Sequence, residues 1–131
     1  MLVLFDAVWD PHPKLGKQPE PRPNVHNSGW VQCPGYSVLN DPARYDDLHS
    51  YVTGIVTAFK DDERVLIWDL YNEPDNMNLA SYKDDNYAQH KADLSMELLK
   101  KTITWVREVA PVQPITMAPW QRDWSDHGQL T

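Results

Sequence analysis

The alternation of short apolar runs with helical patterns constrains the fold of this chain more than any other feature. Three apolar runs, over about residues 2–9, 65–71 and 115–120, are bounded by loop residues and are too short for helices, which is typical of buried parallel strands. Helical patterns over about residues 42–60 and 86–110 separate them. The order strand, helix, strand, helix, strand predicts βαβ units and a parallel sheet with right-handed crossovers.

Both helical patterns carry start signals and an apolar stripe. Asp41 followed by Pro42 is typical of an N-cap and a first helical position, and Asp84 and Asp85 stand where the second helix needs a cap and first-turn charge. Pro111 and Pro114 mark the exit of the second helix. The expected buried stripes are Tyr45, Leu48, Val52, Ile55, Val56 and Phe59 in the first helix, and Leu98, Leu99, Thr102, Val106 and Val109 in the second.

The segment over residues 10–40 has a composition of its own. It holds six of the eleven prolines and shows no periodicity. A long loop of this kind in a compact domain is functional or disordered, and its apolar and aromatic residues favour an ordered lid. The segment follows the C-terminal end of a strand, where barrel enzymes build their sites.

Composition excludes several classes of partner. A net charge of −7 without a basic run argues against nucleic acid, and no apolar stretch is long enough to span a bilayer. The single Cys33 excludes an internal disulfide and a cysteine-based zinc cluster, and no motif calls for a cofactor or a metal. The first ten residues lack the pattern of a signal peptide, so localisation stays open.

The triplet Asn72-Glu73-Pro74 closes an apolar strand and carries most of the chemical information. A carboxylic acid at this position would stand at the mouth of a barrel, on a rigid strand and before a proline that restricts the turn. Glycoside hydrolysis needs such an acid to protonate the departing sugar oxygen, and the neighbouring amide can bind a sugar hydroxyl. Tyr71 points to the opposite side from Asn72 by strand alternation, so we expect it to pack in the core, as we do Trp68 and Trp105.

The run from Val65 to Pro74 resembles the fourth strand of the clan A glycoside hydrolases, which include cellulase-, mannanase- and family-2-like barrels. The stretches around Leu4-Phe5-Asp6, residues 14–19 and residues 26–32 are similar to bacterial cellulase-like and xylanase-like barrel proteins. The resemblance implies a partial (β/α)₈ barrel covering about the third to fifth βα units. It also implies retaining hydrolysis of O-glycosidic bonds in a β-linked oligo- or polysaccharide, with Glu73 as general acid/base and Asn72 on the sugar 2-hydroxyl.

In that clan the nucleophile is a second glutamate at the end of the seventh strand, and no other glutamate here follows a core strand. A retaining mechanism needs two carboxyl groups about 5–5.5 Å apart. The chain also begins directly in a strand, and the polar stretch over residues 121–131 stands where a further helix would begin. We therefore interpret it as a fragment that is inactive alone, with the remainder of its own barrel missing.

Five further residues are candidates for substrate contact. Asp6 ends the first strand and should point toward the same mouth as Glu73. Trp9, Trp30 and Trp120 lie at or beyond strand ends, where their rings could stack on sugar faces, and His26 in the lid could reach sugar hydroxyls.

Two alternatives remain open. One is a metal-dependent barrel hydrolase with Asp6, Asp10, His12 and His26 as ligands, although their spacing fits no compact metal motif. The other is a carbohydrate-binding barrel without catalysis. Stacking aromatics do not distinguish glucan, mannan and xylan, so the sequence leaves the sugar undefined.

Overall fold

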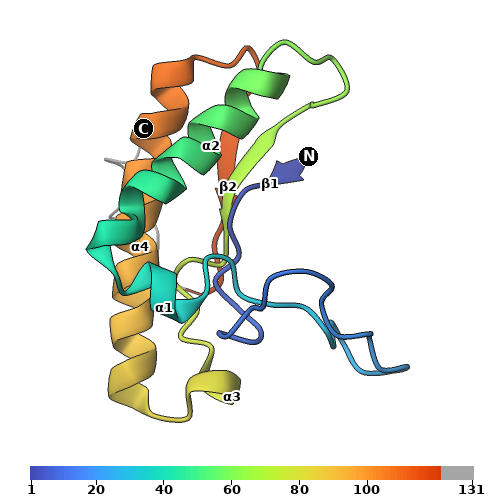
Figure 1. Cartoon of the computed structure of the whole chain (residues 1–131), viewed down its shortest axis with the longest axis vertical. Coiled ribbons are helices and arrows are strands. Elements are labelled where there is room, and N and C mark those ends of the chain that lie inside the picture. Colours follow the sequence, from blue (N-terminus) through green and yellow to red (C-terminus); the bar gives the residue numbers. More distant parts are fainter. Residues whose placement is uncertain (122–131) are drawn as a thin grey trace.

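The computed structural model describes residues 1–121 and shows a mixed α/β fold built on a three-stranded parallel sheet. Strand β2 (Trp68–Asn72) lies at the centre, between β1 (Leu2–Val3) and β3 (Ile115–Ala118). Helix α2 (Tyr45–Phe59) connects the first two strands and α4 (Asp85–Val109) connects the last two, so each crossover carries one long helix. In Figure 1 both long helices lie on the same side of the sheet.

Three short helices complete the described chain. They are α1 (Tyr36–Leu39), the 3₁₀ helix η1 (Pro42–Arg44) directly before α2, and α3 (Leu79–Tyr82) before α4. The predicted cap of the first helix is confirmed, because the Asp41 side chain accepts a hydrogen bond from the Ala43 amide. Asp84 likewise accepts from the Tyr87 amide at the start of α4. None of the described helices is long and apolar enough to cross a membrane.

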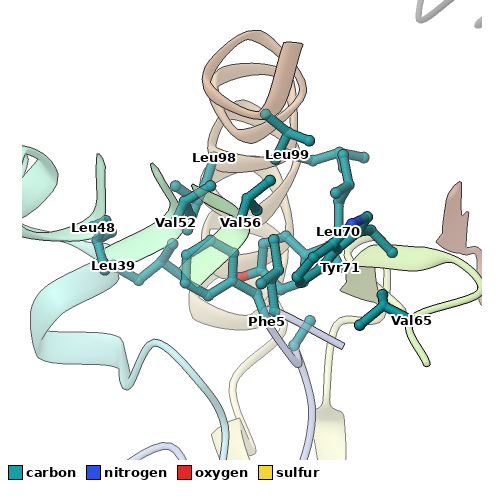
Figure 2. Packing of buried hydrophobic residues seen from close by; sticks show 14 residues of the cluster. Phe5, Leu39, Leu48, Val52, Val56, Val65, Leu70, Tyr71, Leu98 and Leu99 are labelled. Carbon is teal, nitrogen blue, oxygen red and sulfur yellow. The ribbon is translucent and has the colours of Figure 1, made fainter. Parts of the chain in front are cut away.

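The core lies between the sheet and the two long helices. Figure 2 shows Val52 and Val56 of α2 and Leu98 and Leu99 of α4 packed around the aromatic rings beneath them. Phe5 and Tyr71 meet there with ring centroids 5.5 Å apart. Tyr71 is fully buried, as predicted, and so is Trp68, whose indole donates to Gln113 Oε1. Phe59, expected in the stripe of α2, is 39% exposed because it lies in the last turn of the helix.

The expectation of three buried strands holds for β2 and for part of the first apolar run, where Leu4, Phe5, Ala7 and Val8 are buried. Leu2 and Val3 of β1 are 40% and 48% exposed, and β3 is half-buried to exposed. The reason is position: β2 has a neighbour on each side and helices over it, whereas β1 and β3 are the edges of the described sheet. Trp105 packs against the core cluster, as expected, and its ring lies 5.2 Å from that of His49 in α2.

The first strand is shorter than the expected range 2–9, because its ladder to β2 is irregular. Beyond Val3 the chain still donates from Leu4 N to Asp69 O and from Ala7 N to Asn72 O. Asp6 instead exchanges both backbone hydrogen bonds with Cys33, on the other side of the strand. The pairing of β2 with β3 also shifts register between Asp69 and Asn72. The polar stretch over residues 121–131 lies, apart from Gln121, outside the described residues.

Candidate active site

The C-terminal ends of the three strands meet at one edge of the sheet. Asp6 forms a parallel bridge with Asn72, and the Glu73 amide donates to the Ala118 carbonyl over 2.6 Å. Just beyond β3, the Trp120 amide donates to the Asp75 carboxylate over 2.8 Å. The three chain segments are therefore bound to one another where the predicted site residues lie.

An open cavity of about 1210 Å³ occupies this edge. All seven residues singled out from the sequence contribute to its lining, and they come from all three strand ends and from the segment over residues 10–40. They are Asp6, Trp9, His26, Trp30, Asn72, Glu73 and Trp120. The cavity is large enough for several sugar rings, because ligand sites of about 300–1,000 Å³ hold drug-sized molecules.

Glu73 lines the cavity only because its backbone departs from the strand. Strict alternation would place Glu73 on the side of Tyr71, which is buried in the core. Its φ of 51° instead lies in the left-handed region, which non-glycine residues rarely adopt. Both Asn72 and Glu73 consequently face the cavity as consecutive residues. Strained backbone of this kind clusters at functional sites.

Asp6 lies beside Asn72 and is half-buried. Its carboxylate accepts a 3.0 Å hydrogen bond from the Val8 amide and a further one from the Asn72 side chain. Burial raises the pKa of Asp6 above its usual value, and the negative charge of Glu73 adds to the rise, while these hydrogen bonds and the charge of Lys91 oppose it. The hydrogen bond to Asp6 orients the Asn72 side chain in the lining of the cavity.

Aromatic side chains form one wall of the cavity. The Trp9 ring lies 5.5 Å from His26 and 6.4 Å from Trp30 between centroids, in edge-to-face arrangements. Trp30 and Trp120 line the cavity and remain 57% and 52% exposed. The Trp9 backbone has a φ of 78°, and its carbonyl accepts hydrogen bonds from Asn78 Nδ2 and Ser81 Oγ.

Sequence reasoning missed several polar residues of the site. Asp75, Asn76, Asn78 and Ser81 follow β2 and look like ordinary loop residues in the sequence, but they line the cavity. The spacing of Lys91 within α4 could have predicted that this lysine is buried. It stands four residues before Ser95 and seven before Leu98, on the stripe of α4 that faces the core, and it is fully buried.

The described residues do not support the metal-dependent alternative. Asp6 and His26 line the cavity, whereas Asp10 and His12 do not. Asp10 Oδ1 accepts a 2.9 Å hydrogen bond from the His12 amide instead. Within residues 1–121 no group of three or more His, Cys, Asp or Glu side chains is placed to hold a metal ion.

Comparison with known proteins gives one match. A family model described as cellulase (glycosyl hydrolase family 5) matches residues 24–130, which is most of the chain and includes Asn72, Glu73 and the aromatic residues Trp30 and Trp120. Searches of curated proteins and of solved structures found no match.

Proposed function

Because the chain belongs to the cellulase family of glycoside hydrolases, glycosyl hydrolase family 5, we propose that Glu73 is the general acid/base of a retaining hydrolase acting on a β-linked oligo- or polysaccharide. Glycoside hydrolysis is the chemistry of the family as a whole. The observation that carries the assignment to Glu73 is the left-handed backbone that brings Asn72 and Glu73 together into the cavity at the end of the central strand.

The proposed reaction has two steps. In the first, the Glu73 carboxylic acid gives its proton to the glycosidic oxygen while a carboxylate nucleophile attacks the anomeric carbon and the glycosidic bond breaks. In the second, the Glu73 carboxylate takes a proton from water, the water oxygen bonds to the anomeric carbon, and the bond to the nucleophile breaks. Glu73 is half-buried, so it can reach both substrate and water.

We place the nucleophile outside the described residues. The other carboxylates at the cavity already accept backbone hydrogen bonds: Asp6 from Val8, Asp69 from Tyr71, and Asp75 from Trp120 and Gln121. The resemblance to clan A implies a second glutamate at a strand end as nucleophile, and among the described residues Glu73 is the only glutamate that lines the cavity. Residues 1–121 alone would on this account not complete the reaction.

The remaining site residues would bind the sugar. Asn72, which donates to Asp6, would also donate to the 2-hydroxyl next to the reacting carbon, a contact that strengthens in the transition state. Trp9, Trp30 and Trp120 would present ring faces to sugar C–H groups, and His26 would contact hydroxyls from the segment over residues 10–40.

We further infer that residues 1–131 belong to one (β/α)₈-barrel domain, with residues 10–40 acting as a lid. The parallel order β1-β2-β3 with both crossover helices on one face is the arrangement that successive barrel units require. In such a barrel the opposite face of the sheet would form the interior, and the cavity would lie at the C-terminal mouth.

The experiment compares two substrates of the complete protein after Glu73→Ala. Hydrolysis of natural glycosides should fall severely, because a poor leaving group needs its proton, whereas a dinitrophenyl glycoside should still form the covalent intermediate. Added azide should then restore turnover by attacking that intermediate without a base, giving a β-glycosyl azide from a β-linked substrate.

Two further variants serve as controls. Asn72→Ala should slow both substrate types without azide rescue, because it removes a binding contact rather than the proton donor. Glu63→Ala removes an exposed glutamate away from the cavity and should change neither rate. Equal activity of Glu73→Ala on both substrates would show that the assignment is wrong, and sugar binding without hydrolysis by the complete protein would favour the carbohydrate-binding alternative.

A further inference from the structure

Glu73 is held by a network that the reaction itself does not require. Asn76 Nδ2 donates to Glu73 Oε2 over 2.8 Å, and the Asn76 amide donates to the Glu73 carbonyl over 3.0 Å. The Asn76 carbonyl in turn accepts a 2.6 Å hydrogen bond from Lys91 Nζ. A continuous chain of contacts therefore leads from the buried side of α4 through the loop after β2 to one oxygen of the carboxylate.

We propose that Asn76 and Lys91 are positioning residues that hold the Glu73 carboxylate in the orientation needed for proton transfer. The inference rests on the proposed role of Glu73 as acid/base. Asn76 would act directly on the carboxylate, and Lys91 would act through Asn76 by fixing the backbone of the loop.

The orientation of the Asn76 side chain is determined by its second contact. Asn76 Oδ1 accepts a 2.7 Å hydrogen bond from the Asn78 amide, so the Nδ2 end is the one that faces Glu73. An amide donor cannot titrate, and it engages Oε2 alone. Oε1 is consequently the oxygen left to exchange the proton with substrate and water.

The same loop is tied to the aromatic wall. Asn78 Nδ2 donates to the Trp9 carbonyl over 2.8 Å, and Asn78 itself has a left-handed backbone with φ of 53°. Glu73, Asn78 and Trp9 all have left-handed backbones, and Asn78 links to Trp9 directly and to Glu73 through Asn76. Such strain persists only where the surroundings over-determine it.

Burying the Lys91 amine costs free energy, and the proposed positioning role accounts for its presence in the core. Its side chain is fully buried in a stripe otherwise made of Ala, Ser, Met, Leu, Thr and Val. Burial lowers the pKa of Lys91 to about 7, although the carboxylates of Asp6, Asp75 and Glu73 act in the opposite direction. A methionine would fill the same space without desolvating an amine, but it could not donate to the Asn76 carbonyl.

The test uses the leaving-group dependence of the complete protein. Asn76→Asp keeps an oxygen that can accept from Asn78 and removes the donor to Glu73. Asn76→Ser replaces the amide donor by a hydroxyl on a shorter side chain without adding charge. Both should lower kcat/KM for a natural glycoside on the order of 10- to 100-fold, because small misplacements of a catalytic group have effects of this size. A dinitrophenyl glycoside, which needs little acid assistance, should lose less than about 3-fold in its glycosylation step. Lys91→Met should show the same selectivity.

Matched controls separate positioning from general damage. Asn86→Asp makes the same chemical change at an exposed residue in the first turn of α4, and Lys100→Met removes an exposed lysine from the same helix. Neither should change the ratio of the two rates, and unfolding curves identify any variant that fails to fold.

The outcomes distinguish the two claims. The inference would be overturned if folded Asn76 and Lys91 variants lost activity equally on both substrates, or lost none. The proposed function would still stand in that case, provided that Glu73→Ala shows the selective loss. A Glu73→Ala variant without selectivity would overturn both. Selective loss in Asn76→Asp, Asn76→Ser and Lys91→Met, with silent controls, is the expected result.

Discussion

The buried amine of Lys91 should make the free energy of unfolding depend on pH, and Lys91→Met should remove this dependence. Its pKa lies at about 7 in the folded chain, against a usual value of 10.5. Each tenfold change in an ionisation constant is worth about 1.4 kcal/mol, so keeping Lys91 charged in the folded state costs about 5 kcal/mol. The side chain is fully buried, so solvent does not screen this cost.

The direction follows from the protons bound by each state. Below pH 7 the amine is charged in both the folded and the unfolded chain, and the folded state carries the whole cost. Between pH 7 and 10.5 the folded amine has lost its proton while the unfolded one keeps it, so the free energy of unfolding rises with pH. Above pH 10.5 both forms are neutral and the cost is gone.

The assay is urea unfolding of wild type and Lys91→Met from pH 6 to 9.5, read as the difference between their free energies of unfolding. Other groups whose pKa values are raised, among them Cys33 and the buried tyrosines, cancel in this difference. The stability of wild type relative to Lys91→Met should rise by about 3 kcal/mol between pH 7 and 9.5. Lys100→Met controls for the loss of one surface charge. Parallel profiles for wild type and Lys91→Met would refute the view that Lys91 is desolvated beneath the site.

Two shorter predictions concern the strained site and the open sheet. Glu73→Gly should be more stable than Glu73→Ala by about 0.5–1 kcal/mol in urea unfolding. The reason is that glycine removes the left-handed strain of the folded state, which outweighs the extra conformational entropy that glycine gives the unfolded chain. Equal stabilities would mean that residue 73 does not hold this backbone in solution. Residues 1–131 in isolation should bind a hydrophobic dye, because Met1, Leu2 and Val3 are 66%, 40% and 48% exposed at the edge of the sheet. Leu2→Lys should lower the dye fluorescence. If residues 1–131 without substitution gave no dye fluorescence, this edge of the sheet would have to be covered.

Local patterns were sufficient for the two long helices, for the central strand and for the choice of the two central candidate residues. Asp41 and Asp84 cap the helices because a short acidic side chain reaches free amides wherever it precedes a helix, which depends on sequence neighbours alone. Val52, Val56, Leu98 and Leu99 are buried because an apolar stripe at helical spacing has one stable orientation. Asn72 and Glu73 could be named because a polar pair that closes an apolar strand lies at the sheet edge in any parallel arrangement.

Other features of the site could not be read in this way. Alternation predicts that Glu73 points into the core, and only the left-handed backbone, held by the contacts of Ala118 and Asn76, turns it toward the cavity. The edge of β1 is exposed although its residues are as apolar as those of β2, because burial depends on which elements cover a strand and not on the strand itself.

The sequence by itself therefore determined the alternation of strands and helices, the caps and stripes of those helices, and the place of the Asn72-Glu73 pair at a strand end. Each of these depends on residues within a few positions of one another. The tertiary structure alone decided that Lys91, fifteen residues after Asn76, binds its carbonyl, and that Trp9 lies against His26 and Trp30. Those contacts join segments whose separation in the chain leaves no periodic trace, because their energies arise only once the sheet has brought the strand ends together.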